Sequence, residues 1–253
     1  MNISNLNTIE QKVRGLQRRL ARGMQVVFNP QKVYLYSKNI YSYHNLSYSH
    51  EGEDMILAKF FSNKSSGFYI DIGAHHPQRF SNTYYFYLRG WRGINIDAMP
   101  NSMNIFKAIR PEDINIETPI SERPETLTYY EFNEPALNSF CPTISQSRNG
   151  LKNYKIISTK KLQTKTLTEI LNNYFPNNCQ EIDFMTIDVE GFDLQVLKSN
   201  DWNKYRPKMV LVEDLKRASF YKDKKSELDE YMAKCNYELY AKSVNTVFYQ
   251  RND

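Results

Sequence analysis

Short apolar runs, several of them followed by an acidic residue, recur along the chain and predict the strands of one sheet. Strands that helices cover on both faces form nearly continuous apolar runs, and such strands are typical of parallel sheets. Five runs have this form: residues 66–72, 93–97, 114–117, 182–187 and 207–212. Two further strands, Tyr237–Lys242 and Thr246–Gln250, are separated by three residues and are typical of an antiparallel hairpin. The pattern therefore predicts an α/β fold with a parallel sheet, flanking helices and a C-terminal antiparallel hairpin.

Segments with helical spacing or capping residues lie between these runs. Helices are expected at residues 51–61, 81–88 and 166–174 and near 226–234. The helix at 166–174 opens with Thr166 and Glu169, which have the spacing of a capping box. Residues 125–132 and 154–163 are predicted strands, and residues 133–147 between them are predicted to be a loop. That loop is interpreted either as a plain surface loop or as a cover over an acceptor site.

The stretch 66–76 combines a buried strand with an acid and a glycine turn at its carboxyl end. Open α/β sheets bind ligands at this edge, where the strand order reverses. A single glycine, Gly73, replaces the three of a dinucleotide fingerprint. Asp71 would repel a phosphate but would attract a cationic or hydroxyl-rich ligand. S-Adenosylmethionine fits this description because it carries a sulfonium, an ammonium and two ribose hydroxyls but no phosphate.

Asp97 ends the second strand, 26 residues after Asp71, which is the length of one βαβ step. A carboxylate there can accept both ribose hydroxyls, as the corresponding acid does in nucleotide-binding folds. The alternative is a cap for the segment that begins at Pro100, and we favour ribose binding because Pro100 and Ser102 already start that segment well. Ser121, after the third strand, is expected near the adenine edge.

Six stretches together resemble the FkbM family of S-adenosylmethionine-dependent methyltransferases, over about residues 48–213. They are residues 51–54 (EGED), 68–77 (FYIDIGAHHP), 81–83 (SNT), 90–97 (GWRGINID), 133–138 (NEPALN) and 187–191 (IDVEG). The resemblance implies a class I methyltransferase (Rossmann-like) fold and O-methylation, commonly of sugar hydroxyls in glycans or metabolites. The expected cofactor-binding residues are Asp71, Gly73, Ala74, Asp97, Ala98, Ser121 and Asp188.

Methyl transfer to a hydroxyl needs a group that accepts the hydroxyl proton, and two routes are open. In the first, His75 or His76 is the general base, since imidazole titrates near neutral pH; the alternative for both histidines is a structural hydrogen bond. Asp188 or Glu190 can replace the histidine as base or orient it. In the second route Asp188, Glu213 and Asp214 hold Mg²⁺, which lowers the pKa of the acceptor hydroxyl.

The composition of the chain favours some classes of binding partner over others. The 33 basic and 28 acidic residues give a mildly basic chain, which favours an acidic glycan or a membrane surface over nucleic acid. The expected acceptor is a glycan, a nucleotide-sugar or a lipid-linked sugar, and Arg79 and Arg92 are candidates for pairing with a phosphate or an acidic sugar. Three scattered cysteines and the absence of an apolar run of about 20 residues favour a cytoplasmic protein.

The chain is predicted to consist of an N-terminal helical extension and connector, residues 1–50, and a methyltransferase domain, residues 51–253. Residues 7–28 carry an apolar stripe at helical spacing, with arginines on the other faces. This helix is expected to pack on the domain or on a second subunit, and the alternative is contact with the inner face of the membrane.

Two other classes of function compete with methyl transfer. The first is a nicotinamide-dependent sugar oxidoreductase, since Tyr-x-x-x-Lys occurs at Tyr34/Lys38 and at Tyr221/Lys225, although the glycine fingerprint is missing. The second is a binding module that keeps the fold without catalysis. Acids at three strand ends argue against the binding module, because nothing structural requires them together.

Overall fold

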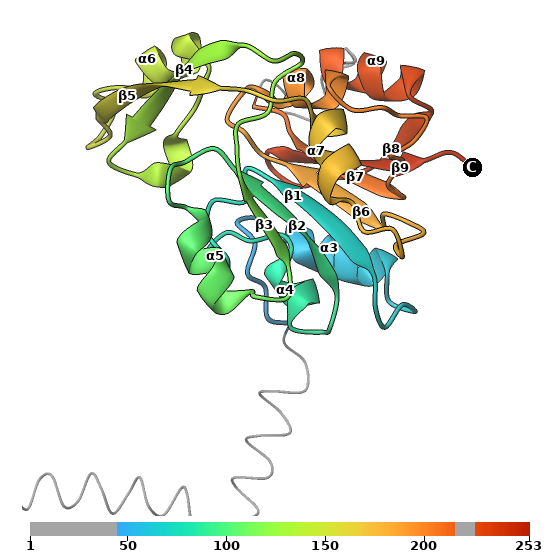
Figure 1. Cartoon of the computed structure of the whole chain (residues 1–253). Helices are drawn as coiled ribbons and strands as arrows, with labels where there is room; N and C mark the ends of the chain where they lie inside the picture. Colours follow the sequence, from blue (N-terminus) through green and yellow to red (C-terminus); the bar gives the residue numbers. More distant parts are fainter. Residues whose placement is uncertain (1–44, 216–225) are drawn as a thin grey trace, which may run out of the picture. The chain divides into compact units, whose positions relative to one another are not determined.

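The computed structural model describes residues 45–215 and 226–253, and a seven-stranded sheet forms its centre (Figure 1). The strand order is β3-β2-β1-β6-β7-β9-β8. The strands are β1 (Phe68–Ile72), β2 (Arg92–Asp97), β3 (Ile114–Glu117), β6 (Phe184–Ile187), β7 (Met209–Glu213), β8 (Tyr237–Lys242) and β9 (Thr246–Arg251). The first five pair in parallel, and β9 pairs antiparallel with both β7 and β8. The α/β fold with a mostly parallel sheet and an antiparallel C-terminal hairpin is therefore confirmed.

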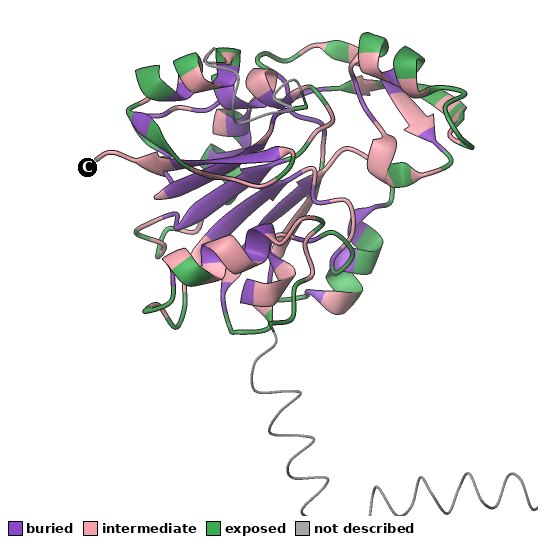
Figure 2. Cartoon of the chain, turned by 180° about the vertical axis from the view of Figure 1, so that it is seen from behind, coloured by how far each residue is buried: buried purple, intermediate pink, exposed green. Residues whose placement is uncertain are grey.

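Helices cover both faces of this sheet. They are α3 (Glu53–Phe60), α4 (Tyr84–Tyr87), α5 (Met103–Ile109), α7 (Leu167–Tyr174), α8 (Asp193–Lys198) and α9 (Glu227–Lys234). Figure 1 shows α7, α8 and α9 on one side of the sheet and α3, α4 and α5 on the other. Side chains of alternate strand residues fill both layers, such as Ile70 and Ile72 on the α7–α9 side and Tyr69 on the α3 side. Figure 2 shows the central strands almost entirely buried, which explains the continuous apolar runs of β1, β2, β6 and β7.

The chain order of the strands places a ligand-binding edge beside β1. After β1 the chain adds β2 and β3 on one side, and it later returns to add β6 and β7 on the other. The direction of strand addition therefore reverses between β1 and β6. Open α/β sheets bind ligands at the carboxyl ends of the strands at such a reversal.

A separate antiparallel pair, β4 (Thr126–Phe132) and β5 (Ile156–Gln163), stands beside the main sheet (Figure 1). Both strands were expected, but the 133–147 segment between them is not simply a loop. It forms a 3₁₀ turn, η1 (Pro135–Leu137), and most of helix α6 (Pro142–Arg148). Proline at the first helical position, where no N–H is needed, starts α6.

Acidic residues before and within α3 fix the entry of the chain into the domain. Asp54 accepts hydrogen bonds from Ser47, Tyr48 and Ser49. Glu51 accepts three hydrogen bonds from the β8–β9 turn, two of them from Asn245. The compact unit that contains the sheet extends from Ser47 to Asp253.

The predicted helix at 7–28 and the connector after it, up to residue 44, lie outside the described residues. The same holds for both Tyr-x-x-x-Lys pairs. Within residues 45–215 and 226–253, no helix is both long enough and apolar enough to cross a lipid bilayer.

Candidate functional site

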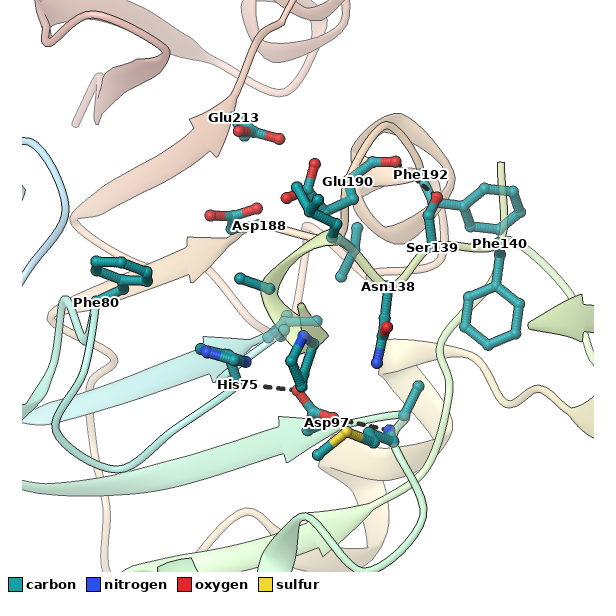
Figure 3. A pocket seen from close by; sticks show the side chains of 18 of the residues that line it. His75, Phe80, Asp97, Asn138, Ser139, Phe140, Asp188, Glu190, Phe192 and Glu213 are labelled. Atoms are coloured by element: carbon teal, nitrogen blue, oxygen red, sulfur yellow. Dashed lines mark hydrogen bonds between the residues drawn. The ribbon is translucent and has the colours of Figure 1, made fainter. Parts of the chain in front are cut away.

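A cavity of about 400 Å³ opens at the carboxyl ends of β1, β2, β6 and β7 (Figure 3). Its floor includes Gly73 and Asp97, and the segment from Glu134 to Phe140 forms one wall. A volume of this size suits a small organic ligand, and its place in the sheet is the expected one for an α/β fold.

Asp97 presents its carboxylate at one end of this cavity. One oxygen accepts the backbone N–H of His75 at 2.9 Å, and the other accepts that of Met99 at 2.7 Å. Burial raises the pKa of the carboxyl group, although these bonds oppose the rise. Because each carboxylate oxygen has two lone pairs, both oxygens retain capacity for a ligand hydroxyl. Asp97 thus lines the cavity, as expected for the ribose, while its bonds to Met99 and to the Ser102 side chain also tie it to the turn before α5, the alternative considered for it.

Neighbours of Asp97 divide into residues that line the cavity and residues that do not. Ala98 lines it, as do Pro119 and Ile120 after β3. Ser121 does not line it, because its hydroxyl is turned to Glu125, to which it donates at 3.0 Å. Ala74 packs instead with Met103 and Phe106 of α5. Of these three predicted cofactor-binding residues, Ala98 therefore lines the cavity, whereas Ser121 and Ala74 do not.

Asp71 does not line the cavity either, although it was predicted to bind the cofactor. Successive side chains of a strand point to opposite faces, and Ile72 takes the cavity face. Asp71 is buried on the other face, where its carboxylate accepts the hydroxyl of Thr83 at 2.6 Å. Burial raises its pKa to about 6. The fully buried Arg110 also donates to Thr83, at 3.0 Å, so this acid belongs to a structural network beneath the site.

Gly73 makes the close approach of two strand ends possible. Its φ of +79° lies in the left-handed region, and a Cβ built on it would lie 1.8 Å from the carbonyl oxygen of Asp188. Its N–H donates to the carbonyl of Ile96 at 2.9 Å. From the sequence, this glycine was explained by the close approach of a ligand to the backbone. In the structure, the group closest to the position of the missing Cβ is Asp188, in the turn after β6.

Substituting Gly73 by Ala is expected to lower the free energy of unfolding by at least about 2 kcal/mol, from left-handed strain and the overlap with Asp188. Urea titration followed by circular dichroism measures this. Gly90→Ala is the matched control, since Gly90 has φ +85° but nothing within 4 Å of the added Cβ. Equal losses in the two variants would show that the contact with Asp188 is unimportant.

The two histidines have different environments. His75 lines the cavity, with φ +52°, and burial followed by the charge of Arg79 lowers its pKa. His76 does not line it: its Nδ1 accepts the backbone N–H groups of Gln78 and Arg79, at 3.1 and 3.0 Å. His75 therefore stays a candidate base, whereas His76 holds the turn that follows.

Three carboxylates converge at the other end of the cavity. Asp188 follows β6, Glu190 lies two residues later and Glu213 ends β7 (Figure 3). One oxygen of each lies within 4.8 Å of the others. Asp188 is open to the cavity but otherwise surrounded by protein, and burial followed by the charge of Glu190 raises its pKa well above the ordinary value. Burial and then Asp188 raise the pKa of Glu213 in the same way.

Asp214 does not belong to this group, contrary to the predicted metal set. It is buried outside the cavity, and its backbone N–H donates to Asn245 at 2.8 Å. Alternation along β7 explains the difference, because Glu213 and Asp214 must point in different directions. Glu190 takes the third place.

Arg148 of α6 ties the wall of the cavity to Glu190. Its guanidinium lies 2.5 Å from the Glu190 carboxylate, and both side chains are largely buried. Burial raises the pKa of Glu190, although Arg148 opposes the rise. Ser139 donates to the Glu190 carbonyl at 2.8 Å, and a Cβ on Gly191 would overlap Ile144. Helix α6 is thus docked on the turn that carries Asp188 and Glu190.

Several cavity residues were not expected from the sequence as site residues: Phe80, Asn82, Glu134, Asn138, Arg148 and Phe192. The carboxamide oxygen of Asn138 accepts the Phe132 N–H at 2.7 Å, and its side chain also hydrogen-bonds Tyr129, another residue of the cavity lining. Two signals pointed to the region of Glu134 and Asn138: the 133–138 block of the resemblance and the interpretation of residues 133–147 as a cover over an acceptor site. No spacing in the sequence links Arg148 to Glu190.

The two arginines proposed for acceptor binding also differ. Arg79 lines the cavity and pairs with Glu134 at 3.0 Å. Arg92 begins β2, at the opposite edge of the sheet from the cavity, and lies 3.6 Å from Glu112. Only Arg79 is placed where it can meet an acceptor.

Comparison with protein families adds an independent observation. The family model described as "Methyltransferase FkbM domain" matches residues 71–239, well over half of the 253 residues. The match includes β1 from Asp71 onward and ends within β8. Comparison with curated proteins found no match.

Proposed function

The chain belongs to the FkbM methyltransferase family, and on that premise we propose that it is an S-adenosylmethionine-dependent O-methyltransferase acting on a sugar hydroxyl of a glycan or glycosylated metabolite. The observation that carries the proposal is a single cavity with an available carboxylate, Asp97, at one end and three clustered carboxylates at the other. The first suits a ribose, and the second suits proton removal next to a cationic ligand.

The cavity residues fit the cofactor. Acidic residues outnumber arginines in the cavity lining. The acids are Glu53, Asp97, Glu134, Asp188, Glu190 and Glu213, the arginines are Arg79 and Arg148, and the histidines are His50 and His75. Both arginines are paired with glutamates. A lining with more carboxyl groups than cations, and with both arginines already paired, favours a cationic, phosphate-free nucleoside over a dinucleotide. Asp97, Gly73 and Ala98 would hold the nucleoside, and the bound cofactor would supply an electrophilic methyl group.

Asp188 is the group best placed to accept the hydroxyl proton. A carboxylate is a weak base at its ordinary pKa, but burial and then the charge of Glu190 raise the pKa of Asp188 and make it more basic. Glu213 can take part by sharing the proton, since repulsion among three acids is relieved when one is protonated. His75 is the second candidate base, and its lowered pKa keeps the imidazole neutral near pH 7.

A divalent cation is the alternative route for the same residues. Oxygens of Asp188, Glu190 and Glu213 within 4.8 Å of one another form a set that Mg²⁺ accepts in proteins. Such an ion would lower the pKa of the acceptor hydroxyl and would leave no need for a protein base of high pKa.

The remaining lining can orient the acceptor and exclude water. The second N–H of the Asn138 amide, beyond the one bonded to Tyr129, can donate to the acceptor, and the rings of Phe140 and Phe192 offer apolar faces for a sugar ring (Figure 3). Helix α6, tied to Glu190 through Arg148, closes that side. Holding the acceptor oxygen in line is the largest contribution expected of these residues.

The test is incubation with methyl-labelled cofactor and pools of glycans, nucleotide-sugars and lipid-linked sugars, followed by mass analysis. We expect one labelled methyl group on a sugar oxygen and no loss of turnover in EDTA if Asp188 is the base. A loss of turnover in EDTA that added Mg²⁺ restores would favour the cation instead.

Thermal stabilisation distinguishes the other two classes of function. Stabilisation by NAD(H) but not by S-adenosylhomocysteine would overturn the proposal in favour of an oxidoreductase. Stabilisation by S-adenosylhomocysteine without turnover on any pool would favour a binding module.

A further inference from the structure

The segment from Arg148 to Lys165 is strongly basic. It contains six basic residues and no acid, whereas the whole chain is nearly balanced. The five lysines among them are exposed: Lys152, Lys155, Lys160, Lys161 and Lys165. The segment comprises the end of α6, a tight turn and all of β5, and it belongs to the part that stands beside the main sheet (Figure 1). Positive charge is therefore concentrated in this segment, whereas the paired strand β4 and its flanks carry acids such as Glu131.

Two large apolar side chains of the same segment are exposed. Leu151 is 58 % exposed and Ile157 is 66 % exposed. The turn is held by backbone bonds from Leu151 to Arg148 and from Tyr154 to Leu151, at 3.0 Å each. Because the turn is fixed by its own hydrogen bonds, burial of these side chains against the domain is not what stabilises it.

Lys152 and Lys155 lie between these apolar residues in the sequence, and both side chains are exposed. Lys160 pairs with Glu131 at 2.7 Å, and Lys161 donates to the Thr128 hydroxyl. Within residues 45–215 and 226–253, no carboxylate lies within ion-pair distance of Lys152 or Lys155. We call Leu151, Lys152, Lys155 and Ile157 the basic-apolar tip.

We propose that the basic-apolar tip binds the surface of an anionic lipid bilayer. Lysines near such a surface are attracted to its headgroups, and exposed Leu and Ile side chains enter the boundary between headgroups and acyl chains. An acidic polysaccharide would use the lysines but would gain nothing from the exposed Leu151 and Ile157. The combination of the two therefore favours a bilayer.

The tip is continuous with the wall of the cavity. Arg148, just before the turn, and Tyr154, at its end, both line the cavity. A bilayer in contact with the tip would therefore lie beside the wall that faces the acceptor. If the proposed function holds, this placement favours an acceptor sugar carried on a lipid, and that extension rests on the proposed function. The membrane contact itself does not depend on the chemistry.

The test is cosedimentation of the full chain with vesicles of phosphatidylcholine alone and with added phosphatidylglycerol. We expect binding only to the anionic vesicles, weakening as salt is raised. The variant with Lys152→Glu, Lys155→Glu, Leu151→Ser and Ile157→Ser should bind at least tenfold more weakly. The matched control carries the same four changes at other exposed positions: Lys107→Glu, Lys198→Glu, Leu88→Ser and Ile105→Ser. It should bind like the unmodified chain.

Each contrary result overturns the proposal. These results are no binding to anionic vesicles, equal binding by the tip variant, or an equal loss in the matched control. Equal binding by the tip variant would place the contact elsewhere, as in residues 7–28. Binding to soluble alginate but not to vesicles would identify an acidic polysaccharide as the partner. A Lys152→Ala, Lys155→Ala variant covers the case in which the fourfold variant does not fold. Binding is measured without turnover, so failure of the membrane contact and failure of the proposed function can be told apart.

Discussion

Asp188→Asn is expected to lower kcat for methyl transfer by about 10³-fold, because asparagine keeps the shape of the side chain but cannot accept a proton. The affinity for S-adenosylhomocysteine should change less than about threefold on this account, since the contacts of Asp97 are intact. Single-turnover kinetics with labelled cofactor separates the two effects. Full turnover by Asp188→Asn would exclude Asp188 as the base.

The pH dependence supplies a second measurement on the same residue. Burial and the charge of Glu190 raise the pKa of Asp188, and only the ionised form can act as a base. Activity should therefore be present above the raised pKa and fall as the pH drops through it, with no such limb in residual turnover by Asp188→Asn. His75→Gln is the control: if it removes the acid limb and Asp188→Asn does not, His75 is the base.

Asp97→Ala is expected to weaken binding of S-adenosylhomocysteine by at least about 100-fold. The substitution removes both carboxylate oxygens and leaves the backbone N–H groups of His75 and Met99 without their acceptor. Isothermal titration calorimetry measures the affinity, and a thermal melt shows whether the variant folds.

Asp71→Asn is the matched control for that experiment. Both acids end or lie near the end of neighbouring strands, but Asp71 faces Thr83 rather than the cavity. Asparagine still offers an oxygen to Thr83, so the affinity for the cofactor product should remain within about threefold. A larger loss in Asp71→Asn than in Asp97→Ala would restore the role that the sequence had indicated for Asp71.

These two acids show how far the sequence can be taken. Apolar runs located all five parallel strands. Four of them, β1, β2, β6 and β7, are buried on both faces, and that burial requires nearly continuous apolar residues. Successive side chains along a strand point to opposite faces of the sheet, so the face of one residue depends on which face the first residue of the strand takes. A sequence with apolar residues on both faces does not reveal that face, so Asp71 and Ile72 were equally eligible for the cavity.

The carboxylate cluster shows the same limit in another form. Asp188 and Glu213 were expected at the strand ends and lie there. Glu190 replaces Asp214 as the third member, because the turn at Glu190 has φ +54° and directs the side chain back to the cavity. Helix α6 was missed since its sequence, PTISQSR, is short and polar. Its contacts with Gly191 and Glu190 stabilise it, and those contacts are distant in sequence.

The position of β9 has a consequence for the order of events during synthesis. This strand is translated after β8, yet it pairs between β7 and β8, and the turn just before it contributes Asn245 to the cavity and to the contact with Glu51. While a ribosome still holds that stretch, β7 has a free edge that can pair with a neighbouring nascent chain. A stalled or prematurely terminated product ending before Thr246 should therefore aggregate rather than persist as a partly active enzyme.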